Sequence, residues 1–362
     1  MGEQLHFQRW RVAAEVLSPL HIGAGGPPLL ADYDFVAERG RVWVLDPQRA
    51  LAGLSDEELA AGVDMRLSRL LRPSQYAACA RYVLPLRGEA PNQILPLVRD
   101  VHDRPYLPGS SLKGALRTAL AWALIYYLAP PFQSQRDVAA GPPERAARPL
   151  ERRLFGPDPN RDLLRALRVR DAQPVGDAAV EATLLGLYGR RGRDLTRIAE
   201  GTRWCVETLA VGARFEGELL VDRGLLAQGQ LPAPRIDDTP LDLADTWYYA
   251  REFAKALVQH EQEFYCSGGL PRIESFYATL AAKLESAEWG ETALPLGWGT
   301  GWFAKTVGLY LQGEDDFDRL VQRLGLARGG RPEEFPASRR LVERGGVAEA
   351  PPGWIWLRLE PR

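Results

Sequence analysis

The longest uncharged apolar run of the chain limits what it can form. It covers residues 118–129 and is ended by Pro130-Pro131. This run is far shorter than the roughly 20 residues that a helix needs to span a bilayer. Ser110 or Ser111, shortly before it, is a natural N-cap. The sequence therefore predicts a water-soluble protein with one long apolar helix that begins at these serines and ends near Leu128.

Other segments have strand or helix patterns in an order that suits an α+β protein. The expected strands are 7–17, a hairpin of 33–36 and 41–45, two strands within 206–222 around Gly212, and a last strand at 354–359. Helical spacing is found in 55–71, 241–264 and 273–286.

The length of 362 residues suggests two domains. Residues 228–240 form the best linker candidate, which predicts an N-terminal domain of residues 1–227 and a C-terminal domain of residues 228–362. Within the first, the segment 133–165 is rich in Arg, Pro and Gly and is expected to be loop or partly disordered.

The charge balance excludes a uniformly basic nucleic-acid binder. The chain has 45 Lys+Arg against 47 Asp+Glu, a formal net charge of −2. A local basic groove stays possible, because binding depends on where charge lies. Only four cations are lysines, namely Lys113, Lys255, Lys283 and Lys305.

The cysteines and histidines carry no recognisable metal motif. Cys79, Cys205 and Cys266 lie far apart without a C-x-x-C pair, and the four histidines are scattered. We therefore expect no metal, no cofactor and no disulfide framework. The first residues lack the apolar region of a signal peptide, so the expected location is a reducing cytoplasm.

The first chemically informative motif is PGSSLKGALR, residues 108–117. Ser110 and Ser111 offer hydroxyls, and the first turn of a helix presents N–H groups that suit a phosphate. Lys113 and Arg117 are four residues apart and share a face, while Gly114 permits a close backbone approach. A capped helix with two solvated cations is the alternative interpretation.

The second motif is GWGTGWFAKT, residues 297–306. Gly297, Gly299 and Gly301 form a flexible backbone that can bind anions, and Lys305 is expected in the first turn of a helix. Trp298 and Trp302 can stack on bases or pack in the core. The segment departs from both the P-loop and the dinucleotide-binding pattern, so nucleotide hydrolysis is not indicated.

The third motif is SPLHIGAGG, residues 18–26, in which a strand end is followed by His21, Gly23 and Gly25. His21 is a candidate RNA contact or general base, or else a packed side chain. Asp32 and Asp34 lie two apart on a predicted strand and form a conceivable acid/base or metal pair, although a solvated hairpin face is the simpler explanation.

Together these three motifs, in this order, resemble the RAMP superfamily of CRISPR-associated proteins. Their forms most resemble the subunits that cap one end of the backbone in type III-A Csm effector complexes. The resemblance implies two RRM-like, ferredoxin-like domains with irregular insertions. It also implies a role in guide-RNA (crRNA) maturation and RNA-guided antiviral interference, without an active site of the subunit's own.

The resemblance implies as partners the 3′ side of the crRNA, the neighbouring backbone subunit, other subunits of the complex and host RNA-trimming nucleases. One alternative is a RAMP endoribonuclease that uses His21 or Asp32/Asp34. The other is a different backbone subunit, or the equivalent subunit of another type III complex. The predicted RNA-binding residues are His21, Gly23, Gly25, Ser110, Ser111, Lys113, Arg117, Gly297, Trp298, Gly299, Gly301, Trp302 and Lys305.

Overall fold

The computed structural model describes residues 7–362 except 53, 56, 58–65, 193, 199–202, 237, 267 and 329. Its strands are β1 (Phe7–Val16), β2 (Leu29–Leu30), β3 (Phe35–Glu38), β4 (Arg41–Leu45), β5 (Ala80–Pro85), β6 (Gln93–Ile94), β7 (Leu167–Val169), β8 (Gln173–Pro174), β9 (Val180–Arg191), β10 (Asp194–Arg197), β11 (Trp204–Leu209), β12 (Arg214–Asp222), β13 (Arg235–Ile236), β14 (Thr239–Pro240), β15 (Glu291–Pro295), β16 (Ser338–Arg344), β17 (Val347–Ala350) and β18 (Trp354–Pro361).

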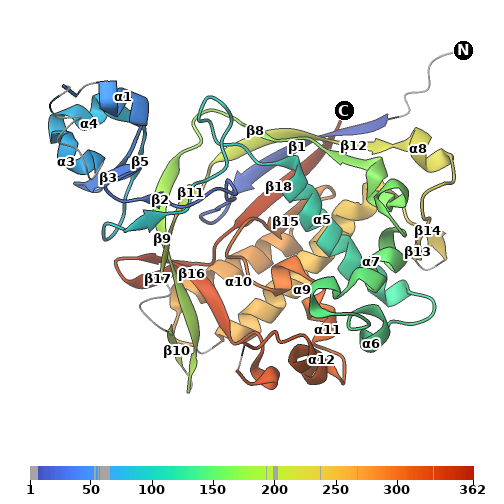
Figure 1. Cartoon of the computed structure of the whole chain (residues 1–362). Coiled ribbons are helices and arrows are strands. Elements are labelled where there is room, and N and C mark those ends of the chain that lie inside the picture. Colours follow the sequence, from blue (N-terminus) through green and yellow to red (C-terminus); the bar gives the residue numbers. More distant parts are fainter. Residues whose placement is uncertain are drawn as a thin grey trace, which may run out of the picture.

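The helices confirm the predicted mixture of α and β structure (Figure 1). They are α1 (Pro47–Ala52), α3 (Leu67–Leu70), α4 (Tyr76–Cys79), α5 (Gly109–Leu124), α6 (Ser134–Asp137), α7 (Arg148–Phe155), α8 (Arg223–Ala227), α9 (Thr246–Tyr265), α10 (Pro271–Glu285), α11 (Gly308–Leu311) and α12 (Phe317–Arg323), with 3-10 turns that include η3 (Pro143–Arg145), η4 (Pro159–Arg161), η5 (Leu163–Ala166) and η8 (Phe303–Lys305).

A six-stranded antiparallel sheet forms the centre of the molecule, with the order β15-β18-β1-β12-β7 and β8 beside β12. The first and last strands are therefore neighbours. On β1 the side chains alternate, and Trp10, Val12, Ala14 and Val16 are buried on one face. This alternation places one whole face of the sheet in the core.

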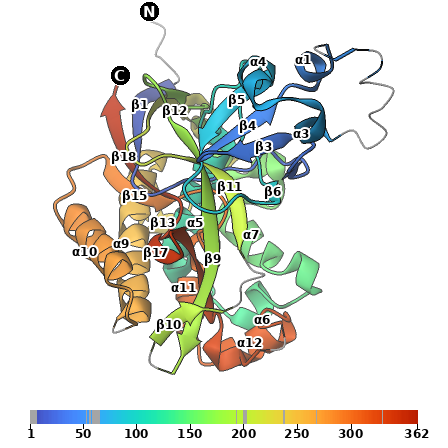
Figure 2. The ribbon, with the colours of Figure 1, turned by 90° about the vertical axis from the view of Figure 1, so that its left-hand side faces the viewer.

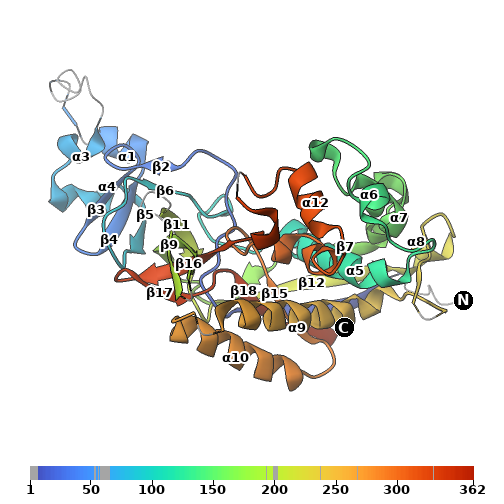
Figure 3. The same cartoon turned by 90° about the horizontal axis from the view of Figure 1, so that it is seen from below.

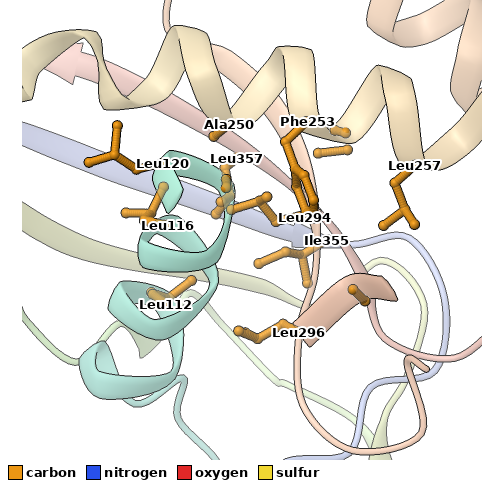
Figure 4. Close-up of a cluster of buried hydrophobic side chains, with 14 of the residues drawn as sticks. Leu112, Leu116, Leu120, Ala250, Phe253, Leu257, Leu294, Leu296, Ile355 and Leu357 are labelled. Carbon is orange, nitrogen blue, oxygen red and sulfur yellow. The ribbon is translucent and has the colours of Figure 1, made fainter. Parts of the chain in front are cut away.

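Helices α5 and α9 cover that face (Figure 4). Leu112, Leu116 and Leu120 follow one another at helical spacing on α5 and pack with Phe253 of α9 and Leu357 of β18. The predicted apolar helix is thus confirmed, although it begins at Gly109 and its last turn is a 3-10 turn. The predicted helices around α9 and α10 are confirmed as well.

The second sheet has the order β10-β9-β16-β17, with β11 also paired to β9. The two strands predicted around Gly212 exist as β11 and β12, but they belong to different sheets. Both large sheets also contain strands from before and after residue 228. Hydrogen-bonded strands thus connect the two predicted parts of the chain, and the division into domains at 227/228 stays a prediction.

A small unit of three strands, β3-β4-β5, carries α1, α3 and α4 and projects from the body beside β9 and β11 (Figure 2). The predicted hairpin is confirmed, with Phe35 paired to Val44. The predicted helical stretch 55–71 lies largely outside the described residues.

The Arg-rich segment 133–165 is not the loop that its composition suggested. It forms α6, η3, α7, η4 and η5, and Leu150, Leu154 and Phe155 are buried against the core. Figure 3 shows α5, α6, α7 and α12 grouped at one end, away from the three-stranded unit. Among the described residues, no helix has the length and apolar character needed to cross a membrane.

Candidate nucleic-acid interface

The backbones of the motifs at residues 18–26 and 297–306 are in direct contact. The N–H of Trp298 donates to the carbonyl oxygen of His21 at 2.8 Å. Gly297 has a φ of +79°, and a Cβ at this position would lie 2.1 Å from the same oxygen. Gly297 is therefore required for the approach of the two loops, which the sequence motifs could not show.

His21 lies inside the protein, with only 2% of its surface exposed. Its Nδ1 is 2.8 Å from the carbonyl oxygen of Glu207, and its ring meets that of Trp298 edge-on at 6.2 Å between centroids. Burial lowers the pKa of His21, because the charged imidazolium is poorly solvated there. Its visible role is to hold the loop after β1 on β11, which favours the packed-side-chain interpretation.

The two tryptophans differ in their surroundings. Trp298 is half-buried beside Trp204, and the guanidinium of Arg340 lies 4.5 Å from its ring centre. Trp302 packs into a cluster with Phe303, Phe317 and Phe335, and part of it lines surface pockets. Trp298 is thus the better-placed stacking candidate in a site shared with a cation.

The flanking glycines of the loops lie at the surface. Gly299 and Gly301 have φ values of +90° and +92°, and a Cβ on Gly301 would meet no atom within 4 Å. Gly23 and Gly25 are exposed, and Gly25 also has a positive φ. These positions leave backbone groups accessible on both loops.

Helix α5 begins one residue before the two serines that the sequence suggested as caps. Its N-cap is Pro108, and Ser110 and Ser111 lie in the first turn. The Gly109 N–H donates to the carboxylate of Asp171 at 2.7 Å. An acid of the protein itself already occupies this helix end, so any phosphate would bind beside it rather than on it.

Lys113 and Arg117 lie on the wall of a cleft of about 630 Å³. Its charged lining residues are Lys113, Arg117, Arg148, Arg152 and Arg165, together with Glu151, Asp158 and Asp162. Five cations therefore face three carboxylates, which gives the cleft a positive balance although the whole chain is slightly negative. We refer to it as the basic cleft.

The cations of the basic cleft are held to different degrees. Arg117 is 2.8 Å from Asp162 and 3.6 Å from Glu151, and it lies over the ring of Phe155. Burial, with Arg117 and Arg168 nearby, lowers the pKa of Lys113. Arg148 and Arg152 are exposed, and within the part of the chain that the structure describes they form no ion pair. These two are available to an external anion.

Lys305 brings the motif of residues 297–306 to the same region. It ends the one-turn helix η8 rather than starting a longer helix, and it is exposed. Together with Arg117 it lines a second pocket, which adjoins the basic cleft. Nearby protein partly desolvates the ammonium and lowers the pKa of Lys305. Arg117 lines both cavities and thereby connects Lys113 of the basic cleft with Lys305 of the second pocket. His21 and Trp298 form a cluster of rings of their own, although Lys305 is near enough to His21 to help lower its pKa.

The candidate acid pair lies in a turn before β3, not on a strand as expected. Asp32 has a φ of +70°, and the carboxylate of Asp34 accepts the Leu30 N–H at 2.7 Å. The side chain of Asp34 therefore stabilises the turn. Among the described residues no group of three or more His, Cys, Asp or Glu side chains is arranged to hold a metal ion.

A buried carboxylate that sequence reasoning did not single out lies beside this region. Glu207 accepts hydrogen bonds from the Tyr82 hydroxyl at 2.7 Å, the Leu97 N–H at 3.0 Å and the Arg99 guanidinium at 3.0 Å. Burial and the neighbouring carboxylate raise the pKa of Tyr82. Glu207 thereby ties β11 to β5 and to the segment after β6.

Known proteins share this fold. A solved chain from a Csm–crRNA–target RNA ternary complex of a type III-A CRISPR-Cas system is 25% identical, with a TM-score of 0.71, covering 97% of this chain and 100% of that one. The crystal structure of T. onnurineus Csm5 shares the fold, with 24% identity, a TM-score of 0.62 and coverage of 95% of this chain and 99% of that one.

A curated relative from Methanocaldococcus jannaschii, described as CRISPR system Cms protein Csm5, is 21% identical over 385 residues, which cover 96% of this chain and 88% of the relative. The family model of the RAMP superfamily matches residues 13–303, a span that contains the motifs of residues 18–26 and 108–117 and the first seven residues, 297–303, of the glycine-rich motif. The chain therefore belongs to the RAMP superfamily.

Proposed function

We propose that this protein is a crRNA-binding subunit of a type III-A CRISPR Csm effector complex, located at the end of the backbone near the 3′ side of the guide. The observation that carries the proposal is that two adjoining cavities share Arg117, while Lys113 lines the basic cleft and Lys305 lines the second pocket. The similarity to a chain of a Csm–crRNA complex supports it.

The chemistry of the cleft suits a guide of variable sequence. Arginine and lysine side chains bind phosphates and position an RNA without reading its bases. Arg148 and Arg152 extend the cationic surface beyond the two motifs. In this proposal the two large sheets belong to RRM-like units, and the subunit contributes to crRNA maturation without catalysing a reaction itself. Its further partners are the adjacent backbone subunit, other subunits of the complex and RNA-trimming nucleases.

The test compares two double variants with the same change in charge. Lys113→Ala with Lys305→Ala should release crRNA from the purified complex at lower salt, because two phosphate contacts are lost. On single strands each phosphate contact contributes roughly 0.7 to the slope of log affinity against log salt. The loss of two contacts should therefore make this slope less steep by about 1.4.

The control is Lys255→Ala with Lys283→Ala. These two lysines lie on α9 and α10, where Lys255 pairs with Glu285 and Lys283 lies over the ring of Trp356. Equal RNA retention in both double variants would contradict the proposal. Cleavage of RNA by the purified subunit, lost in Asp34→Ala, would instead support the endoribonuclease.

A further inference from the structure

An apolar pocket opens next to the basic cleft. It has a volume of about 290 Å³ and is enclosed by α5, α7, the turn around η8 and α12. Its walls include Ala121, Leu150, Leu154, Trp302 and Leu324. Pockets that bind planar organic groups have such walls, which gain free energy when they exclude water.

The rim of this pocket is charged. Arg117 and Lys305 lie among its lining residues, as do the hydroxyl-bearing Thr118 and Thr306. Arg117 and Glu151 line both the pocket and the basic cleft, so the two cavities share a wall. The pairing of Glu151 with Arg117 reduces the repulsion that this carboxylate would exert on an anion.

We propose that the apolar pocket receives one unstacked nucleobase of the bound RNA, while the adjoining phosphates contact Arg117 and Lys305. This inference rests on the proposed function. Single-stranded RNA is commonly bound with bases splayed out of the stack and placed against aromatic or apolar side chains. The cationic rim beside an apolar interior complements a nucleotide, which is anionic on one side and flat and apolar on the other.

The walls also suggest how selective the pocket is. The two threonine hydroxyls already bond within the protein, Thr118 to the carbonyl oxygen of Gly114 and Thr306 to that of Trp302. Few free polar groups remain to read the edge of a base. The pocket should therefore accept any of the four bases, as a guide of variable sequence requires.

An abasic scan of the RNA tests the proposal without altering the protein. Guide RNAs that each lack one base are bound to the full-length subunit, and their dissociation constants are compared with that of the intact RNA. Removal of the base at one position should weaken binding about tenfold, which is within the range that stacking of one base contributes. Removal of the base at any other position should change the affinity little. Uniform effects at all positions would overturn the pocket.

A protein variant connects that position to this pocket. Ala121→Met fills the pocket and should weaken binding of the intact RNA, while the abasic RNA should bind the variant as well as it binds the unaltered protein. Ala282→Met, at an exposed position of α10, is the matched control. Additive effects of Ala121→Met and the abasic site would also overturn the assignment.

Two further outcomes separate this inference from the proposed function. If Ala121→Met lowers the melting temperature markedly, Thr118→Leu at the half-buried rim replaces it. If either variant releases a neighbouring protein subunit and leaves RNA affinity unchanged, a protein side chain fills the pocket and the proposal is wrong. The salt dependence of the Lys113/Lys305 variant tests RNA binding independently of all these results.

Discussion

Single residues show which positions of a motif are required for packing within the protein and which positions have no packing contact. Gly109 and Gly114 belong to the same motif and the same helix. A Cβ on Gly109 would lie 2.2 Å from the carbonyl oxygen of Val169, whereas one on Gly114 would meet nothing within 4 Å. Packing within the protein therefore explains the first glycine, but not the second.

This contrast gives a paired prediction. Gly109→Ala should lower the free energy of unfolding by about 1–3 kcal/mol, because backbone atoms have to move. Gly114→Ala should raise it by about 1 kcal/mol, since alanine is the better helix former. Denaturant titration of the purified chain measures both changes.

Gly114→Ala also probes the interface. Gly114 is exposed between Lys113 and Arg117, so an added methyl group would stand where the proposed function places the RNA backbone. The variant should be more stable than the unaltered protein and yet hold RNA less tightly. A gain in both stability and affinity would mean that no backbone approaches at this position.

The Arg-rich segment shows at the scale of elements why composition misled. Its prolines indicated a loop, but Pro143, Pro149 and Pro159 lie at the starts of η3, α7 and η4, where proline is tolerated. Leu150, Leu154 and Phe155 then bury one side of α7. These short helices depend on tertiary contacts, which local sequence does not encode.

A buried ion cluster fastens this segment. Asp137 has no exposed side-chain surface and is 2.8 Å from Arg136 and 2.5 Å from Arg153. Burial alone would raise the pKa of Asp137, but hydrogen bonds from the two guanidinium groups bring it down to about 2 from 3.8. The ionised carboxylate is therefore stabilised by folding.

The stability from this cluster should depend on pH in one direction. Because the pKa of Asp137 is lower in the folded protein than in the unfolded chain, its ionised carboxylate stabilises the fold at pH values above about 4. This contribution is lost as the pH falls toward 2. At pH 7 Asp137→Asn should lower the free energy of unfolding by about 2 kcal/mol. The difference from the unaltered protein should shrink between pH 4 and 2. Glu334→Gln, at a surface pair with Arg331, is the control and should leave the stability nearly unchanged across this range.

At the scale of the molecule, pairing between distant segments decides the architecture. The strands and helices with strong periodicity were predictable, among them β1, the β3–β4 hairpin, α9 and β18. The adjacency of β1 and β18, and the separation of β11 and β12 into two sheets, have no local signal. Likewise the sequence indicated Lys113 and Lys305 as candidate phosphate-binding cations. That Arg148 and Arg152 line the same cleft as Lys113 could be seen only in the folded structure.

The attachment of the three-stranded unit to the body gives the last prediction. Glu207→Gln removes the charge that pairs with Arg99, whose side chain is only 11% exposed, and disturbs the bonds to Tyr82 and Leu97. Breaking a buried pair of this kind costs about 3 kcal/mol. Because Tyr82 lies on β5, amide hydrogen exchange should accelerate in β3–β5, while β1 and β18 in the central sheet stay protected.

The control is Glu216→Gln on β12, which removes a carboxylate that pairs with Arg11 at the surface. Both side chains are more than a third exposed there, so this variant should change exchange in neither region. If exchange accelerates equally in β1 and β3–β5, Glu207 supports the whole fold rather than the junction between its parts.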